Sequence, residues 1–356
     1  MTSNLIIKAG KNAFAMIRDG GFDWDRITTY YGAASGPRWL IASGFDLTLM
    51  QENCLGRNHP VLLAGASSGA WRLTPWLFPE AMKSYLELRH AYIETVFRRG
   101  ITPGEVQETL KKVIDHYIED DAIPFALKNN RYRLAIITAR SRNLLASENP
   151  LILKIGFGLC FLSNAVFPSS IHSHFERTVF YSGPKPPLFC FRDTFRGRYI
   201  PLQADNLKHV VLASGAIPLA VAGVRDIYGA PNGIYRDGGM VDYHINELFT
   251  DNPQEITLFF THQGWNQPTW MDKKLKYRHA PPSFMDNVLM VYPSQDFIAS
   301  LPNGKIPDRD DFVDYLDQHA TRIRNWWEAV EKSKHLGEEF LELTASGHIR
   351  DSVSLI

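Results

Sequence analysis

Short apolar runs recur along the chain and alternate with stretches in which apolar residues follow helical spacing. The runs lie at 27–31, 61–64, 134–138 and 256–261. Continuous apolar runs of this length are typical of strands that are covered on both faces. Apolar residues at helical spacing, interleaved with charges, occupy 81–98 and 105–118. Strands that alternate with helices predict an α/β fold with a mostly parallel central sheet in three α/β/α layers.

The pattern changes twice in the second half of the chain. Residues 168–201 are rich in proline, glycine, serine and aromatic side chains, which predicts a long connection. Beyond residue 307 the chain is charged and helical in pattern, through to residue 334. We therefore expect one domain over residues 1–307 and a C-terminal helical extension, 308–356, packed on the same domain.

One segment, 155–162, is continuously apolar or glycine. It is far shorter than the ~20 residues that a membrane-spanning helix needs. A buried element is the expected structure. A lipid-facing segment that lies at a membrane surface is the alternative.

Composition excludes several classes of protein. The 356 residues carry 38 basic and 38 acidic side chains, and this balance argues against a general nucleic-acid binder. Three cysteines without C-x-x-C spacing support neither a disulfide framework nor a zinc site. The first 18 residues lack the pattern of a secretory signal. We expect a cytoplasmic protein, with membrane association or export without a cleaved signal as open alternatives.

A turn of small residues follows the second apolar run. Residues 62–70 read Leu-Leu-Ala-Gly-Ala-Ser-Ser-Gly-Ala and contain G-x-S-x-G, with Gly65, Ser67 and Gly69 at its fixed positions. A tight strand-to-helix turn exposes a serine hydroxyl, and small neighbours let the chain approach itself closely. The pattern alone suits a helix-capping serine equally well. Pro75 predicts that the following helix kinks or ends.

A second strand-to-helix turn lies one unit earlier in the chain. It reads Gly-Ala-Ala-Ser-Gly-Pro-Arg over 32–38, and a helical pattern follows over 38–52. Proline at the first helical position loses no hydrogen bond, and the N–H groups of Ser35 and Gly36 before it are candidates to bind an anion. Neighbouring parallel strands would bring this turn and Ser67 to the same sheet edge. An ordinary β–α turn is the alternative.

A serine hydroxyl needs a base before it attacks an ester, and two residues are candidates. Asp237 precedes Gly238 and Gly239, which let the backbone come close to a catalytic loop. His262 follows the fourth apolar run, and Ser67, Asp237 and His262 have the order of the α/β-hydrolase triad. A plain Asp-Gly hairpin turn and a structural histidine are the alternative interpretations.

Together these segments resemble the patatin-like phospholipase family. Residues 65–70 resemble its nucleophile motif, and 237–239, continued by 240–242, resemble its aspartate motif. Residues 213–218, Ala-Ser-Gly-Ala-Ile-Pro, are similar to its Ala-Ser-x-Ala-x-Pro segment, and 135–140 to its central strand. The resemblance covers well over half the chain and implies a patatin-like three-layer fold.

The resemblance implies a Ser–Asp dyad without a histidine. Asp237 would accept the Ser67 proton, an acyl-enzyme would form on Ser67, and water would release the fatty acid. The implied substrate is a lipid or another acyl ester, and no metal or other cofactor is implied. Such a substrate also makes peripheral contact with a membrane an expectation.

The oxyanion loop departs from the family pattern, which has a glycine-rich run, an arginine and a further glycine. Gly36, Arg38 and Gly44 fall at the matching spacing, but Ala34 and Ser35 replace two glycines. The departure puts the rate and the substrate range in question more than the reaction class.

Pro37 lies inside the same loop and cannot donate an N–H. The resemblance therefore leaves Ser35 and Gly36 as the donors, supported by the arginine, with Ser68 as a further residue that contacts the substrate. The bulk of Trp39 would narrow the acyl site.

Three hypotheses follow from the sequence. The first is a lipid acyl hydrolase of the phospholipase A or esterase type that uses Ser67 and Asp237. The second is an esterase with a Ser67, Asp237 and His262 triad. The third is a catalytically weak, lipid-binding scaffold with the same fold.

Overall fold

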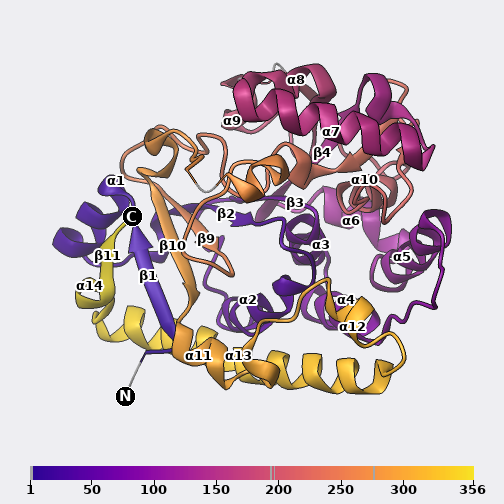
Figure 1. The fold of residues 1–356 in the computed structure, drawn as a ribbon. Helices are drawn as coiled ribbons and strands as arrows, with labels where there is room; N and C mark the ends of the chain where they lie inside the picture. Colours follow the sequence, from indigo (N-terminus) through magenta and orange to yellow (C-terminus); the bar gives the residue numbers. More distant parts are fainter. Residues whose placement is uncertain (1–2, 193–194, 196, 276) are drawn as a thin grey trace.

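A single mixed sheet organises the computed structural model, which describes residues 3–192, 195, 197–275 and 277–356 (Figure 1). The strand order is β11-β1-β10-β9-β2-β3-β4-β5-β6, and β8 pairs with β4 and β7. The strands are β1 (Leu5–Ala9), β2 (Ile27–Gly32), β3 (Val61–Ala66), β4 (Tyr132–Ser141), β5 (Phe175–Tyr181), β6 (Arg198–Pro201), β7 (Val224–Arg225), β8 (Ile234–Asp237), β9 (Ile256–Phe260), β10 (Val288–Pro293) and β11 (Val353–Leu355).

Helices surround this sheet. They are α1 (Lys11–Ala15), α2 (Ala42–Gln51), α3 (Ser68–Leu73), α4 (Ala81–Glu94), α5 (Pro103–Tyr117), α6 (Ile123–Leu127), α7 (Pro150–Val166), α8 (Ile171–His174), α9 (Leu188–Phe191), α10 (Leu207–Ser214), α11 (Gln295–Ser300), α12 (Asp311–Asp314), α13 (His319–Ser346) and α14 (Ile349–Ser352).

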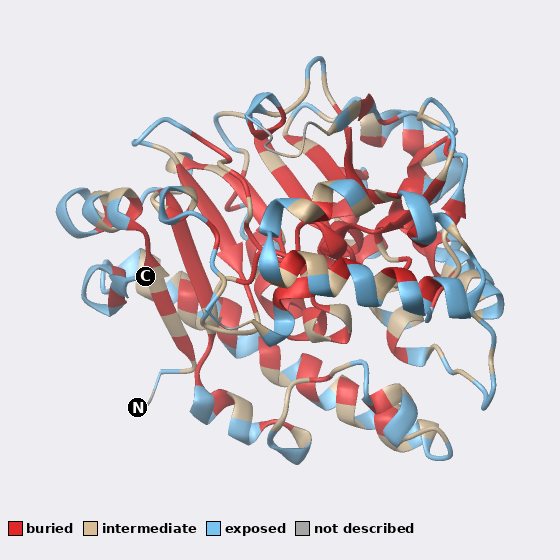
Figure 2. Cartoon of the chain, turned by 45° about the horizontal axis from the view of Figure 1, so that its top comes forward, coloured by how far each residue is buried: buried red, intermediate tan, exposed pale blue. Residues whose placement is uncertain are grey.

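The middle of the sheet is parallel, as the sequence predicts. Strands β10, β9, β2, β3 and β4 run parallel to their neighbours, whereas β1 on β10, and β5 and β8 on β4, are antiparallel. The four apolar runs predicted as strands correspond to β2, β3, β4 and β9. Each of them is buried along nearly its whole length, and Figure 2 shows these central strands in red.

Successive side chains of the central strands enter two separate cores, because strand side chains alternate between faces. Tyr30 and Leu63 belong to the core formed with α2, α4, α5 and α13. Tyr31 and Ala64 belong to the core formed with α7, α8 and α9. Helices therefore cover both faces, and the predicted three-layer α/β/α class with a mostly parallel sheet is confirmed.

The predicted helices are present with shifted ends. The pattern at 81–98 corresponds to α4 and that at 105–118 to α5, which begins with a capping box on Thr102. The pattern at 38–52 divides into a 3-10 helix, η3 (Gly36–Ile41), and α2. Helix α3 ends at Leu73, and the 3-10 helix η4 (Thr74–Leu77) contains Pro75, as its position predicts.

The C-terminal segment packs closely on the sheet layer. Helix α13 crosses α2 at glycines: a Cβ on Gly44 would lie 2.2 Å from the Ser333 carbonyl oxygen, and one on Gly337 2.3 Å from Thr48 Oγ1. Beyond α13, β11 adds a parallel strand to β1. The segment thus holds helices and a terminal strand that its sequence did not predict, and its description as an extension of a domain over residues 1–307 remains a prediction.

Two expectations for the middle of the chain are wrong. The stretch 168–201 was expected to be a long connection, but it holds strands β5 and β6 of the main sheet, with residues 193, 194 and 196 outside the described residues. The apolar segment 155–162 was expected to be buried, but it lies within α7, which exposes one apolar side to solvent. An apolar pattern around a whole helix does not reveal which of its faces is covered.

Candidate active site

Ser67 lies at the sharp turn between β3 and α3. Its φ of 54° and ψ of −130° place a non-glycine residue in strained backbone. The strand ends at Ala66 and the helix begins at Ser68, so the turn has a single residue. This is the geometry that projects a serine hydroxyl from the end of a strand.

The two glycines of the motif are needed because three backbone segments meet here. A Cβ on Gly69 would lie 2.0 Å from the carbonyl oxygen of Gly32, at the end of β2. A Cβ on Gly65 would lie 2.8 Å from the carbonyl carbon of Gly69. The glycines thus let the start of α3 lie directly against the ends of β2 and β3.

Asp237 is the last residue of β8, which pairs antiparallel with β4 and places Asp237 opposite Thr138. The 3-10 helix η8 (Gly238–Met240) follows, so this is not the Asp-Gly hairpin turn of the alternative interpretation. A Cβ on Gly238 would lie 2.1 Å from the Ile137 carbonyl oxygen. The first glycine therefore lets the aspartate loop rest directly on β4.

The serine and the aspartate are in direct contact, although 170 residues separate them in sequence. The Ser67 hydroxyl donates to Asp237 Oδ2 at 2.7 Å, and the Gly239 N–H donates to Asp237 Oδ1 at 2.7 Å. Both side chains are buried, with 5% and 4% of their surface exposed. Burial raises the pKa of Asp237 to about 6, against the lowering effect of these two hydrogen bonds. The carboxylate is therefore a stronger base than an ordinary aspartate, yet mostly ionised at neutral pH.

The end of α10 and the residues just after it hold the backbone at both Ser67 and Asp237. The Ser67 N–H donates to Ser214 Oγ at 2.8 Å, and this hydroxyl donates to the Ile137 carbonyl at 2.7 Å. The Asp237 N–H donates to the Ala216 carbonyl at 3.0 Å. The sequence singled out the segment 213–218 only by resemblance, and it did not identify Ser214 as the residue that binds the Ser67 N–H.

The turn after β2 lies beside Ser67, but its two N–H groups are not both free to bind an anion as the sequence predicted. The Ser35 N–H donates to Ser68 Oγ at 3.1 Å, so it is not the free donor that the sequence suggested. Gly36 has φ +57° and opens η3, where a first residue has no intrahelical partner for its N–H. Gly36 is therefore the better-placed donor of the two.

The side chains of Arg38 and Trp39, which are adjacent in this turn, enter different parts of the protein. Arg38 Nη2 lies 3.6 Å from Asp308 Oδ2, and the side chain lines a polar cavity beside Ser67. The Trp39 ring instead packs in the core against Tyr85 and Tyr92. It does not narrow the acyl site as expected.

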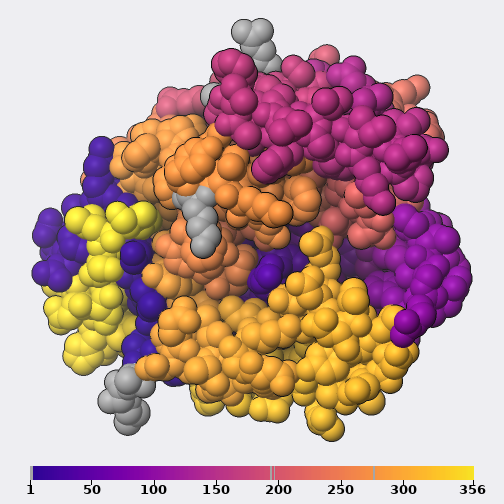
Figure 3. All heavy atoms as spheres, in the orientation of Figure 1, coloured from indigo at the N-terminus to yellow at the C-terminus, as the bar shows by residue number. Residues whose placement is uncertain are grey.

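Two cavities of similar size meet at Ser67. The first, of about 120 Å³, is almost wholly apolar, and its wall includes Trp71, Val106, Leu110, Ile217 and Phe312. The second, of about 110 Å³, is polar, and its wall includes Arg38, Asp237, Tyr243, Lys273 and Arg309. Figure 3 shows a hollow near the middle of this face, where indigo N-terminal residues lie between orange and yellow segments.

Lys273 and Arg309 are site residues that sequence reasoning missed. Lys273 belongs to the 3-10 helix η9 (Trp270–Lys274), and its ammonium lies 5.1 Å from the centre of the Tyr243 ring. Burial, reinforced by the charges of Arg38 and Arg309, lowers the pKa of Lys273 to about 8. Neither residue lies in a motif, so only the folded chain brings them to Ser67.

His262 is half-buried and lies beside His244 instead of Ser67. Its ring is 5.7 Å from that of His244, and neither histidine belongs to the wall of the two cavities. Burial lowers the pKa of His262 well below its usual value. Among the described residues, Asp237 alone accepts a hydrogen bond from the Ser67 hydroxyl.

The described residues contain no cluster of three or more histidine, cysteine, aspartate or glutamate side chains that could hold a metal ion. Cys54, Cys160 and Cys190 are all buried.

No protein-family model and no curated sequence matches this chain. Among solved structures it is similar to VipD from Legionella pneumophila, with 10% identity and a TM-score of 0.32 over 95% of this chain and 70% of that one. It is also similar to human GIVD cytosolic phospholipase A2, with 11% identity and a TM-score of 0.33 over 96% of this chain and 62% of that one. With similarities this low, we infer function from the geometry of the chain itself.

Proposed function

We propose that this protein is a lipid acyl hydrolase in which Ser67 is the nucleophile and Asp237 is the base. The observation that carries the proposal is the 2.7 Å hydrogen bond from the Ser67 hydroxyl to Asp237, at a strained turn between strand and helix. A helix-capping serine does not need this arrangement, because a cap accepts hydrogen bonds from the backbone N–H groups of its helix. The Ser67 side chain makes no such cap bond.

The reaction follows from the positions of these atoms. Ser67 Oγ attacks the acyl carbonyl while Asp237 Oδ2 takes the hydroxyl proton. The tetrahedral intermediate collapses, the C–O bond to the alcohol breaks, and Asp237 returns the proton to the departing oxygen. A water molecule, deprotonated by Asp237, then attacks the ester on Ser67, and the free fatty acid leaves as Ser67 recovers its proton.

The oxyanion of the intermediate needs N–H donors on the side of Ser67 that faces away from Asp237. The Gly36 N–H is the candidate in the turn after β2, and the N–H groups of the first α3 residues lack intrahelical partners. The engagement of Ser35 with Ser68 keeps this turn fixed against α3. We assign Ser35 and Ser68 to positioning, and Gly36 to contact with the substrate.

The two cavities favour a substrate with two unlike parts. The apolar cavity suits an acyl chain, since each buried methylene contributes about 0.8 kcal/mol. The polar cavity holds three cationic side chains, and Asp237 and Asp310 are the acids in its wall. Phosphate-bearing alcohols fit such a cavity as leaving groups, which favours a phospholipid over a neutral glyceride.

Turnover of an ester panel tests the proposal. We expect hydrolysis of a short-chain ester and of phospholipids, and a loss of about 10²–10⁴-fold in kcat on Asp237→Asn. His262→Ala separates the dyad from the triad, because its rate should remain within a few-fold of the wild type. A loss near 10⁴-fold on His262→Ala would favour the triad. Folded wild-type protein that hydrolyses none of these esters would favour the scaffold.

A further inference from the structure

Helix α7 exposes a continuous apolar stripe. Six apolar side chains along it are between 38% and 68% exposed, namely Leu151, Ile152, Ile155, Leu159, Leu162 and Val166. At 3.6 residues per turn these positions fall within an arc of roughly 100° on one side of the helix. Single exposed leucines are ordinary, but a contiguous apolar stripe on one helix marks an interaction surface.

The charges around this stripe are cationic. Helix α7 has no acidic residue, and its one charged residue, Lys154, is exposed. Glu148, just before the helix, is paired with Arg236 at 2.7 Å.

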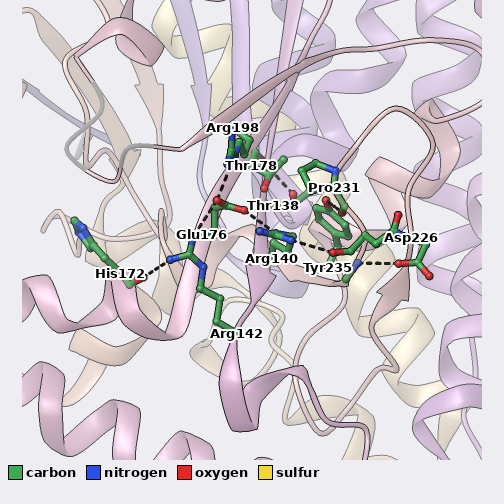
Figure 4. Close-up of polar contacts among 12 residues, drawn as sticks. Thr138, Arg140, Arg142, His172, Glu176, Thr178, Arg198, Asp226, Pro231 and Tyr235 are labelled. Carbon is green, nitrogen blue, oxygen red and sulfur yellow. Dashed lines mark hydrogen bonds and ion pairs between the residues drawn. The ribbon is translucent and has the colours of Figure 1, made fainter.

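An arginine cluster lies at the same side of the molecule. Arg140, Arg142 and Arg198 share one largely buried carboxylate, Glu176, at 2.6, 2.9 and 3.4 Å (Figure 4). Arg142 also donates to the His172 carbonyl in α8 at 3.2 Å.

Contacts with α7 place this cluster beside the stripe. Arg142 immediately precedes the 3-10 helix η6 (Asn143–Ala146), on which α7 packs, and a Cβ on Gly156 would lie 3.1 Å from Leu144 Cβ. Helix α8 contacts α7 as well. Because three arginine side chains share one glutamate, the cluster carries an excess of positive charge next to the stripe. The formal net charge of the whole chain is zero.

The opposite side of α7 contacts η9, the segment that lines the candidate active site. Asn164 Nδ2 donates to Asp272 Oδ1 at 2.9 Å, and the rings of Phe157 and Trp270 lie 6.4 Å apart, edge to face. Asp272 and Trp270 both belong to η9, which supplies Trp270 and Lys273 to the polar cavity. Helix α7 and the contact of its Phe157 with Trp270 thus lie between the stripe and the polar cavity.

We infer that the apolar stripe of α7 docks on a lipid bilayer, with the arginine cluster contacting anionic head groups. The buried side of the helix holds it on the protein, so the exposed side enters the interface with the helix in the plane of the membrane. Cations beside the stripe favour an anionic lipid surface over a second copy of this neutral chain. The inference deepens the proposed function, on which its use for lipid hydrolysis rests. No helix among the described residues is long and apolar enough to span a bilayer.

Vesicle co-sedimentation of the full-length Ser67→Ala protein tests the inference without hydrolysis. We expect binding to phosphatidylcholine vesicles that contain phosphatidylglycerol. Leu162→Asp should weaken it about tenfold or more, since burying a leucine contributes about 1.5–3 kcal/mol. Leu355→Asp is the matched control, because its side chain is 56% exposed against 64% for Leu162 and it lies on β11, at the other edge of the sheet. The control should bind within about twofold of its parent.

A second variant tests the contribution of the arginine cluster. Arg142→Gln should weaken binding to the anionic vesicles about fivefold, since each cation near such a surface contributes about 1 kcal/mol. It should leave the weaker binding to pure phosphatidylcholine unchanged. Melting temperatures within a few degrees of the parent establish that each variant is folded, and Leu151→Asp replaces Leu162→Asp if the latter is not.

Three results would overturn the inference: absence of vesicle binding by the parent, equal losses in the Leu162 variant and its control, or a solution dimer that Leu162→Asp dissociates. Hydrolysis of a soluble short-chain ester separates this failure from that of the proposed function. A protein that hydrolyses the soluble ester but does not bind vesicles refutes the docking surface alone. A protein that binds vesicles through α7 but hydrolyses no ester refutes the proposed function alone.

Discussion

The two cavities that meet at Ser67 are alike in volume and opposite in chemistry. The apolar cavity is lined mainly by α3, α5 and the segment after α10, and its wall is almost wholly apolar. The polar cavity comes from η3, η8, η9 and the loop before α12, and brings Arg38, Lys273 and Arg309 within reach of Asp237. Under the proposed function, each cavity would take one of the two halves of an ester, with the Ser67 hydroxyl at the boundary between them.

Two effects act on the pKa of Asp237 in opposite directions. Exclusion of water raises the pKa of Asp237, whereas the positive charges of Lys273 and Arg309 lower it. The resulting value of about 6 keeps the carboxylate ionised and basic at neutral pH. A substitution in the wall of either cavity should alter the choice of substrate more than the rate of the reaction at Ser67.

The largest expected difference between the two sides concerns acyl-chain length. Val106→Trp would fill part of the apolar cavity and should lower kcat/KM for a long-chain ester about 10–100-fold, since each excluded methylene forfeits about 0.8 kcal/mol. The acetyl ester of the same alcohol should keep its rate, because its acyl group does not reach that far. A ratio of long-chain to acetyl rates that does not change would show that acyl chains do not use this cavity.

The dependence of kcat/KM on pH should distinguish the effect of Asp237, which acts on every substrate, from the effect of the cations in the polar cavity. Below pH 6 the rate should fall about tenfold per pH unit for every substrate, since Asp237 must lose its proton to act as a base. Above pH 8 the rate should fall for a phosphate-bearing ester alone, because Lys273 loses its charge there. A flat profile from pH 4 to pH 7 would exclude Asp237 as the base.

Lys273→Met should give the smallest effect and the most specific one. Loss of one charged contact should lower kcat/KM for an anionic ester about fivefold to tenfold and leave a neutral ester of equal chain length almost unchanged. The variant should also lose the fall in rate above pH 8 and raise the pKa of Asp237. Equal losses on both substrates would indicate a general structural effect.

The parts of the site that lie in short contiguous motifs were predictable. Ser67 stands in a run of small residues after an apolar run that predicts a strand, and Asp237 precedes two glycines, although the strand before Asp237 was not predicted. The tight turn also predicted that small residues are needed beside Ser67, and the structure adds that a Cβ on Gly69 would clash with the end of β2.

The parts that depend on distant contacts were not predictable. Lys273 reaches the cavity from a short 3-10 helix and Arg309 from a turn, and neither segment carries a periodic signal. Ser35 was expected to be a free donor, but the hydroxyl of Ser68 occupies its N–H. The sequence did not reveal which side of α7 is exposed, for the same reason. Its apolar residues surround the helix, and only packing decides which of them are covered.

Labelling of Ser67 by a fluorophosphonate, followed by intact-protein mass, tests the central claim most directly, because the probe reacts only with a serine that has been activated by a base. Wild-type protein should gain one label at Ser67, Ser67→Ala should gain none, and Asp237→Asn should react at least about 10²-fold more slowly at an unchanged melting temperature. If Asp237→Asn reacted as fast as the wild type, the carboxylate would not be the group that draws the proton from Ser67.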